Sequence, residues 1–273
     1  MYRRRFGLTC HPMPKNAMGK TYFDQQPGYQ KLKKYFDQLI ADPGLGILTG
    51  NAGIGKTAAI RNLCNQLPRP NHLVLYLCDT TVSPVDLYRT LALELGIKPL
   101  HRRSQLWDDI KKTLVHMVDE RGTSPIVIID EAQHLSDKFL MDLSGFLNFA
   151  FDTRDLLTLW LVGLTGLTRR LKMHNHQALT TRKAAEVRLE SLDRETFTAL
   201  IDFSLKSAGA TQKLLAEPAI EQLFRTCQGV PREAARILRA ALQLAHEKDQ
   251  NFVDEIIMEK AIDEIAKTAG ILS

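Results

Sequence analysis

Residues 50–57 of this sequence read Gly50-Asn51-Ala52-Gly53-Ile54-Gly55-Lys56-Thr57. They match the phosphate-loop pattern G-x-x-x-x-G-K-S/T, with an apolar, strand-length run before them and a helical pattern after them. Glycines let backbone N–H groups turn toward phosphate oxygens, and the N-terminus of the following helix favours negative charge. We expect all eight residues to bind a nucleotide, with the Lys56 ammonium on the β- and γ-phosphates and the Thr57 hydroxyl on Mg²⁺.

An acidic pair follows a second apolar run. Residues 126–129 are continuously apolar, and Asp130 and Glu131 come directly after them. Such a run is typical of a strand that is covered on both faces of its sheet. We expect Asp130 to hold Mg²⁺ and Glu131 to polarise the water that attacks the phosphate. The alternative is a pair that only ends a strand and caps the next helix.

A glutamate directly after the metal-binding acid favours hydrolysis over phosphoryl transfer to a small acceptor. It also predicts a further strand beside the phosphate-loop strand, and residues 159–162 with Gly163 supply one. Thr165 follows that strand. It either orients the attacking water or caps the helix that begins at Gly166.

The chain alternates strands and helices up to about Glu190 and is helical after it. Strand-length apolar runs are residues 45–49, 73–77, 126–129, 159–162 and 185–189. Helical patterns begin at Pro27, Ser83-Pro84, Ser104 (as an N-cap) and Ser136, the last of them extending to about Ala150. We predict an α/β fold with a parallel five-stranded sheet, followed by a helical domain. The expected boundaries are a basic N-terminal segment 1–25, an α/β core 26–190 and a helical domain 191–273.

The composition of the 273 residues is that of a globular protein. Hydrophobic residues make up 44% and charged residues 25%, which excludes a disordered chain. No apolar run approaches the ~20 residues of a membrane span, and no secretory signal is recognisable. The four cysteines form no C-x-x-C pair, so a zinc site is not indicated. These features predict a cytoplasmic protein without a membrane segment, and the net charge of +5 permits an acidic partner.

Together these motifs resemble the AAA+ ATPases, in the branch that holds the ExeA-type ATPases and the transposition regulators TnsC, TniB, IstB and MuB. The resemblance covers nearly the whole chain. It is carried by Phe6-Gly7-Leu8, by Asp130-Glu131-Ala132-Gln133-His134-Leu135, by Leu161-Val162-Gly163 and by Gly229-Val230-Pro231-Arg232. One departure is Leu164, because ExeA-like proteins usually have glutamine there. This departure weakens the assignment of Thr165 as the residue that senses the γ-phosphate.

The resemblance implies a P-loop ATPase whose helical domain is a lid, assembled as a ring or helical filament with ATP between subunits. Arg232 would then contact the nucleotide from its own lid. Arg182, just before the last strand, would reach the γ-phosphate of the neighbouring subunit, and an arginine there stabilises the charge of a transferring phosphoryl group. The alternative for Arg182 is a plain surface arginine. Arg154, Arg169 and Arg170 compete with it for the intersubunit role.

The resemblance also implies duplex DNA running through the ring, held by basic residues between the second and third strands. That segment holds Lys98, His101, Arg102, Arg103, Lys111 and Lys112. The last four are our predicted DNA contacts, because Arg102 and Arg103 precede a helix N-terminus where a phosphate can bind. The alternative is a solvated face, since Asp108 and Asp109 lie nearby. Arg3-Arg4-Arg5 is a second candidate, as a basic arm rather than a solvated tail.

The function predicted from these features is that of an ATP-dependent, sequence-nonspecific DNA-binding regulator of transposition. It would oligomerise on target DNA, recruit or stimulate a transposase and a target-selection protein, and hydrolyse ATP to disassemble. The alternative is an ExeA-like secretion or assembly ATPase that does not bind DNA. A DEAH-type helicase is less favoured because residues 191–273 are helical rather than a second RecA-like half. A clamp-loader or origin-binding relative is less favoured because no winged-helix domain is recognisable.

Overall fold

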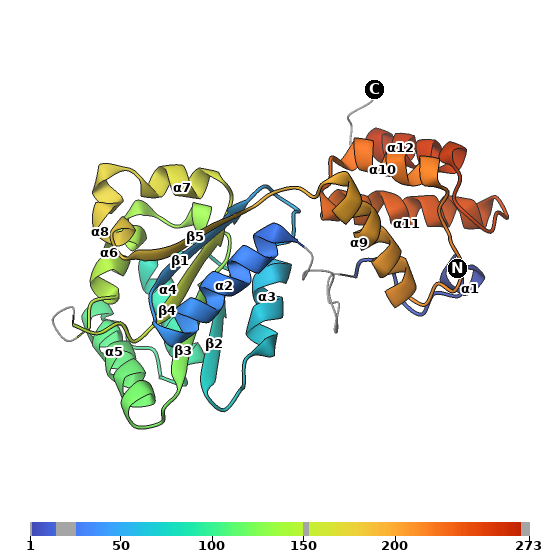
Figure 1. Cartoon of the computed structure of the whole chain (residues 1–273). Helices are drawn as coiled ribbons and strands as arrows, with labels where there is room; N and C mark the ends of the chain where they lie inside the picture. The colour runs from blue at the N-terminus through green and yellow to red at the C-terminus, as the bar shows by residue number, and fades with distance from the viewer. Residues whose placement is uncertain (1, 15–25, 150–152, 269–273) are drawn as a thin grey trace. The chain divides into compact units, whose positions relative to one another are not determined.

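A computed structural model describes residues 2–14, 26–149 and 153–268 (Figure 1). Its residues divide into two compact units. One unit comprises Pro27–Ala52 and Lys56–Leu189, and the other comprises Met1–Gln26, Gly53–Gly55 and Glu190–Ser273. The C-terminal part of the second unit begins at Glu190, one residue before the expected boundary. Within the described ranges, no helix is both long and apolar enough to cross a membrane.

The first unit is built on a sheet of five parallel strands in the order β2-β3-β4-β1-β5. The strands are β1 (Leu45–Gly50), β2 (His72–Leu77), β3 (Ser124–Ile129), β4 (Thr158–Gly163) and β5 (Lys183–Leu189). Each contains one of the predicted apolar runs, so the predicted parallel five-stranded α/β fold is confirmed. Strand β4 lies between β1 and β3 and pairs with both, as the sequence predicted for the phosphate-loop neighbour.

Helices cover both faces of the sheet, which explains the continuous apolar strands. They are α2 (Pro27–Ala41), α3 (Lys56–Gln66), α4 (Pro84–Glu94), α5 (Arg103–Asp119), α6 (Asp137–Phe146), α7 (Gly166–Leu171) and α8 (Gln177–Thr180), with 3-10 turns η1 (Ala132–His134) and η3 (His174–His176). On one face, Phe36 of α2 stacks on Trp160 of β4, with ring centroids 6.2 Å apart. Gly46 makes room for this ring, because a Cβ at Gly46 would lie 2.6 Å from it. The opposite face packs against α4, α5, α6 and α7 in one large core.

Three of the four predicted helix starts, including Pro27, are confirmed and one is wrong. The Ser83 and Ser136 hydroxyls accept capping hydrogen bonds from the backbone N–H groups of Asp86 and Phe139. Helix α5, however, begins at Arg103 with Arg102 as its N-cap, so Ser104 is not the cap. Helix α6 ends at Phe146, short of the predicted end, and Ala150 lies outside the described residues.

The second unit is a bundle of α9 (Arg194–Ser207), α10 (Glu217–Cys227), α11 (Pro231–Glu247) and α12 (Glu255–Thr268), together with the short α1 (Tyr2–Arg5). Asp193 caps α9 and accepts from the Thr196 N–H at 2.8 Å. Gly229 explains part of the Gly-Val-Pro-Arg signature. It has φ +72°, and a Cβ there would lie 2.0 Å from the carbonyl oxygen of Leu192. Only glycine fits this turn into α11.

The described part of the N-terminal segment is neither a separate segment nor a solvated tail. Tyr2, Phe6 and Leu8 are buried in the core of the helical unit. The Arg5 guanidinium forms an ion pair with Asp249 and donates to the Gln250 carbonyl at 2.9 Å. The apolar side chains flank the three consecutive arginines, and burying them fixes the segment on the bundle. Residues 15–25 lie outside the described ranges.

Candidate nucleotide-binding site

The phosphate loop joins the carboxyl end of β1 to the start of α3. Gly53 and Gly55 have φ values of +79° and +97°, which side chains other than glycine rarely adopt. Lys56 is 8% exposed, and its ammonium donates to the carbonyls of Gly50 and Asn51 at 3.0 and 2.9 Å. The residues predicted to bind the nucleotide therefore form one turn that ends at a helix N-terminus, which is a geometry suited to phosphate.

Asp130 lies at the carboxyl end of β3 and contacts the phosphate-loop helix. It is 3% exposed, and its Oδ2 accepts from the Thr57 hydroxyl at 2.6 Å. A backbone N–H, that of Glu131, donates to its Oδ1 at 2.9 Å. The structure thus brings together the two oxygen ligands predicted for Mg²⁺, although Thr57 lies on α3 and Asp130 follows β3. A hydroxyl and a carboxylate are the oxygen donors that a hard divalent cation prefers, so the residues fit the ion.

Glu131 is held in an unusual backbone conformation. Its φ and ψ are 52° and 35°, in the left-handed region, which costs a residue other than glycine roughly 1–2 kcal/mol. The Thr80 hydroxyl donates to its carbonyl at 2.9 Å, and the amide of Gln133 donates to its carboxylate at 2.6 Å. The side chain is exposed at the same sheet edge as the phosphate loop. A carboxylate in this position can accept a proton from a water near the phosphate.

Tyr76 is a site residue that the sequence analysis missed. Its hydroxyl donates to Asp130 Oδ2 at 2.9 Å, so Asp130 Oδ2 has two hydroxyl donors. Burial and the neighbouring carboxylate raise the pKa of Tyr76 above its ordinary value, so the hydroxyl remains a donor at neutral pH. The signal in the sequence was a polar-tipped side chain near the end of the strand paired with β3.

Thr165 lies in the turn between β4 and α7. It is the N-cap of α7, but its side chain forms no capping hydrogen bond with a described residue. The preceding Leu164 donates its backbone N–H to the side chain of Gln133 at 3.0 Å.

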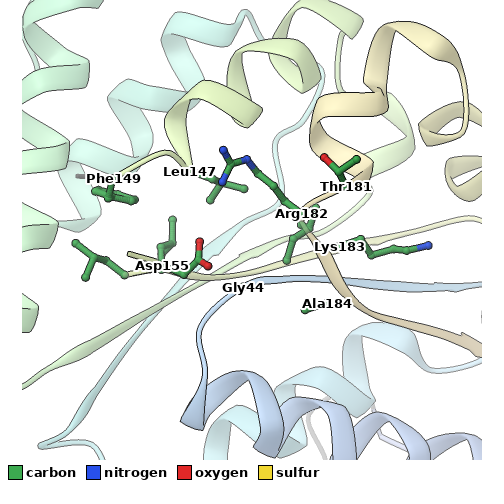
Figure 2. A pocket seen from close by; sticks show the side chains of 11 residues that line it. Gly44, Leu147, Phe149, Asp155, Thr181, Arg182, Lys183 and Ala184 are labelled. Carbon is green, nitrogen blue, oxygen red and sulfur yellow. The ribbon is translucent and has the colours of Figure 1, made fainter. Parts of the chain in front are cut away.

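Arg182 lies at the amino ends of the strands, whereas the phosphate loop lies at their carboxyl ends. Arg182 directly precedes β5, whose start pairs with the start of β1. Figure 2 shows it in a pocket that Gly44, Asp155 and Lys183 also line. Its charge contributes, after burial, to lowering the pKa of Lys111, so the two cations lie near each other.

The competing arginines differ in their surroundings. Arg170 donates to Asp137 Oδ1 from Nη2 at 2.5 Å and to the Gln133 carbonyl at 3.1 Å. Arg154 forms an ion pair with Asp119 at 2.6 Å. Both are thus engaged within their own unit, whereas Arg169 is exposed. Arg232 is the second residue of α11 and is also exposed.

Three of the four predicted DNA contacts have intramolecular partners. Arg103 pairs with Asp142 at 2.7 Å, and its guanidinium lies 4.6 Å from the centroid of the Trp107 ring. The Lys111 ammonium donates to the carbonyls of Gly145 and Asn148 at 3.1 and 2.5 Å.

The ammonium of Lys112 is paired with Asp108 at 2.6 Å, one helical turn earlier. Arg102 is exposed and, within the described residues, forms no ion pair. The candidate basic surface therefore shifts to the loop before α5, where Lys98, His101 and Arg102 are exposed.

Comparisons with known proteins find relatives of this chain. Residues 40–171 match the family described as AAA domain. The chain is 28% identical over 235 residues to general secretion pathway protein A of Aeromonas hydrophila, a match that covers 85% of this chain and 42% of that protein. It is 30% identical over 99 residues to ATP-dependent target DNA activator B of Escherichia phage Mu, covering 36% of this chain and 30% of that protein. The chain thus spans less than half the length of these relatives.

A solved structure shares the fold. The Drosophila ORC bound to DNA has a TM-score of 0.75, covers 99% of this chain and 67% of the other chain, and is 16% identical. At this identity the likeness concerns the fold alone.

Proposed function

We propose that this chain hydrolyses ATP and is an ATP-dependent DNA-binding regulator of transposition. The match of residues 40–171 to the AAA domain and the similarity to the secretion protein and the DNA activator support this proposal. It binds duplex DNA without sequence preference and oligomerises on it as a ring or helical filament. It recruits or stimulates a transposase, with a target-selection protein as a further candidate partner, and ATP hydrolysis releases it.

The proposed reaction is hydrolysis of ATP with Mg²⁺, and each residue of the site has one task. The loop 50–57 binds the phosphates through its backbone N–H groups and Lys56. Thr57 and Asp130 hold the metal ion, which neutralises phosphate charge when bound. Glu131 accepts a proton from the attacking water. Arg232 from the lid and Arg182 from a neighbouring subunit complete the charge stabilisation, and Thr165 orients the water.

The observation that carries the DNA-binding part is the exposed basic loop before α5. Lys98 and Arg102 form no ion pair within the described residues, and His101 lies between them in the chain. Exposed cations on one loop are available to phosphate oxygens, and such contacts bind DNA without reading its sequence. The name of the phage Mu relative, a target DNA activator, supports the same role.

We expect duplex binding in the presence of a non-hydrolysable ATP analogue to weaken steeply with salt. The double variant Lys98→Ala, Arg102→Ala should weaken binding to all sequences alike. It should also make the slope of log K against log salt shallower by about 0.9 for each phosphate that the variant no longer neutralises. Arg103 is left intact because its side chain packs on Trp107. The measurement is a salt titration of fluorescent duplexes of unrelated sequence.

The matched control is Lys33→Ala, Lys34→Ala, which removes the same charge from exposed positions on α2. It should leave the slope nearly unchanged. An equal loss in both double variants would mean that general charge, not this loop, is responsible. Absence of duplex binding by the wild type at low salt would reject the transposition role. It would favour a secretion-type ATPase, which the longer match to general secretion pathway protein A already makes the second candidate.

A smaller prediction concerns Tyr76. Tyr76→Phe removes one of the two hydroxyl donors on Asp130 Oδ2 and should raise the Mg²⁺ concentration for half-maximal ATP hydrolysis by about tenfold, since such supporting contacts orient metal ligands. The measurement is a Mg²⁺ titration of the ATPase rate. Tyr35→Phe, on α2, is the control and should behave as wild type. An unchanged Mg²⁺ requirement in Tyr76→Phe would limit Tyr76 to a structural role.

A further inference from the structure

We infer that Gln133 is a positioning residue for Glu131, tying the carboxylate to the carboxyl end of β4 through its side-chain amide. Its Nε2 donates to Glu131 Oε2 at 2.6 Å, and its Oε1 accepts from the backbone N–H of Leu164 at 3.0 Å. Leu164 is the first residue after β4. The inference rests on the role proposed above for Glu131 and adds the group that orients it.

The two neighbours of Gln133 determine which way its amide points. A backbone N–H can only donate, so it requires the amide oxygen. An ionised carboxylate can only accept, so it requires the amide nitrogen. One side chain satisfies both at once, and reversing the amide would break both contacts. The bridge therefore links an ionised Glu131 to the β4 end in a single orientation.

Gly163 leaves the space that this bridge occupies. A Cβ at Gly163 would lie 2.7 Å from Gln133 Oε1 and 3.3 Å from the Gln133 backbone nitrogen. A methyl group there would collide with the amide oxygen and push the bridge away from Leu164. The last residue of β4 thus accommodates the side chain that holds Glu131.

The backbone of Gln133 is fixed as well. The Arg170 guanidinium donates to its carbonyl at 3.1 Å while holding Asp137, and the buried His176 also contacts Asp137 at 3.0 Å. Ala132 beside it is fully buried in the main core. The exposed part of the arrangement is the Glu131 side chain, and Gln133 connects it to this rigid base.

This geometry affects the chemical step rather than nucleotide binding. An exposed glutamate samples several rotamers, and only those that aim the carboxylate at the attacking water support proton transfer. Gln133 restricts that sampling. A misplacement of about 1 Å at a catalytic group can cost on the order of 100-fold in rate.

The first test is Gln133→Ala in the full chain. We expect kcat for ATP hydrolysis to fall by about 10- to 100-fold while KM and nucleotide affinity change less than about threefold. The control is His134→Ala, an exposed neighbour in the same turn, which should hydrolyse ATP as wild type does. A kcat for Gln133→Ala within twofold of wild type overturns the inference. So does a loss that appears in KM alone.

The second test displaces the bridge without removing Gln133. Gly163→Ala should lower kcat by a similar factor, while Gly166→Ala should not, because a Cβ at Gly166 meets nothing within 4 Å. The double variant Gly163→Ala, Gln133→Ala should be no slower than the slower of the two single variants. Both would act through one contact. Fully additive losses would show that Gly163 acts by another route and would overturn its part in the bridge.

Glu131→Gln is measured in the same series to separate the two proposals. If it hydrolyses ATP quickly, Glu131 is not the base and the role proposed for the site fails. If it is slow while Gln133→Ala is fast, the role of Glu131 stands and only the inference about Gln133 fails.

Discussion

Glu131→Gln should bind ATP as tightly as the wild type and hydrolyse it about 10²- to 10⁴-fold more slowly. The amide keeps the size and shape of the carboxylate but cannot take a proton from water, and a general base contributes a rate factor of that size. Asp130 keeps its hydrogen bonds with Thr57 and Tyr76, so the metal ligands are unchanged. The measurement is single-turnover hydrolysis beside calorimetric ATP binding.

The same variant should accumulate in the ATP-bound, assembled state, since the step that releases it is blocked. Size analysis on duplex DNA with ATP should show assemblies that persist for longer than those of the wild type. Glu94→Gln, an exposed glutamate at the end of α4, serves as the control and should hydrolyse ATP normally. Turnover by Glu131→Gln near the wild-type rate would remove Glu131 from the role of base.

The sequence predicts those parts of the fold and site that depend on local pattern. The phosphate loop is recognisable because its glycines and lysine stand at fixed spacing between a strand and a helix. Asp130 and Thr57 meet because parallel strands bring their carboxyl ends to one edge of the sheet. The strand order, with β4 between β1 and β3, follows from the same class of fold.

Contacts between distant residues explain the parts that were missed. Tyr76 reaches Asp130 from a neighbouring strand, and Gln133 reaches across to the end of β4. No local pattern specifies which polar side chain fills such a gap. Arg103 and Lys111 have the composition of a DNA surface, yet Trp107 and nearby backbone carbonyls engage them within the unit. Charge alone does not distinguish a cation that is engaged from one that is available.

Arg182→Ala should lower ATP hydrolysis by about 10³- to 10⁵-fold in the assembled protein, the factor that an arginine from a second subunit contributes in related chemistry. It should leave ATP binding to isolated subunits almost unchanged. The phosphate loop follows the carboxyl end of β1, whereas Arg182 precedes β5 at the other end of the sheet. Strand β1 has five residue steps of about 3.3 Å each, so roughly 16 Å separate its two ends. An arginine side chain cannot span that distance, so any action on a phosphate must be on another subunit's nucleotide.

Mixing two inactive variants tests this directly. A Lys56→Ala subunit has lost its phosphate-facing ammonium and should not bind ATP, but it still carries Arg182. An Arg182→Ala subunit binds ATP but lacks the arginine. In mixed assemblies on DNA, the first can complete the site of the second, so the ATPase rate should recover to a fraction of wild type that depends on the mixing ratio. Arg169→Ala, mixed in the same way, tests the competing candidate, because that arginine is exposed on α7. The mixture with Arg182→Ala can stay inactive, while Arg169→Ala loses hydrolysis by itself and regains it when mixed with Lys56→Ala. That outcome would identify Arg169 as the intersubunit arginine. Recovery with Arg182→Ala would place the active site between subunits and make hydrolysis a property of the assembly.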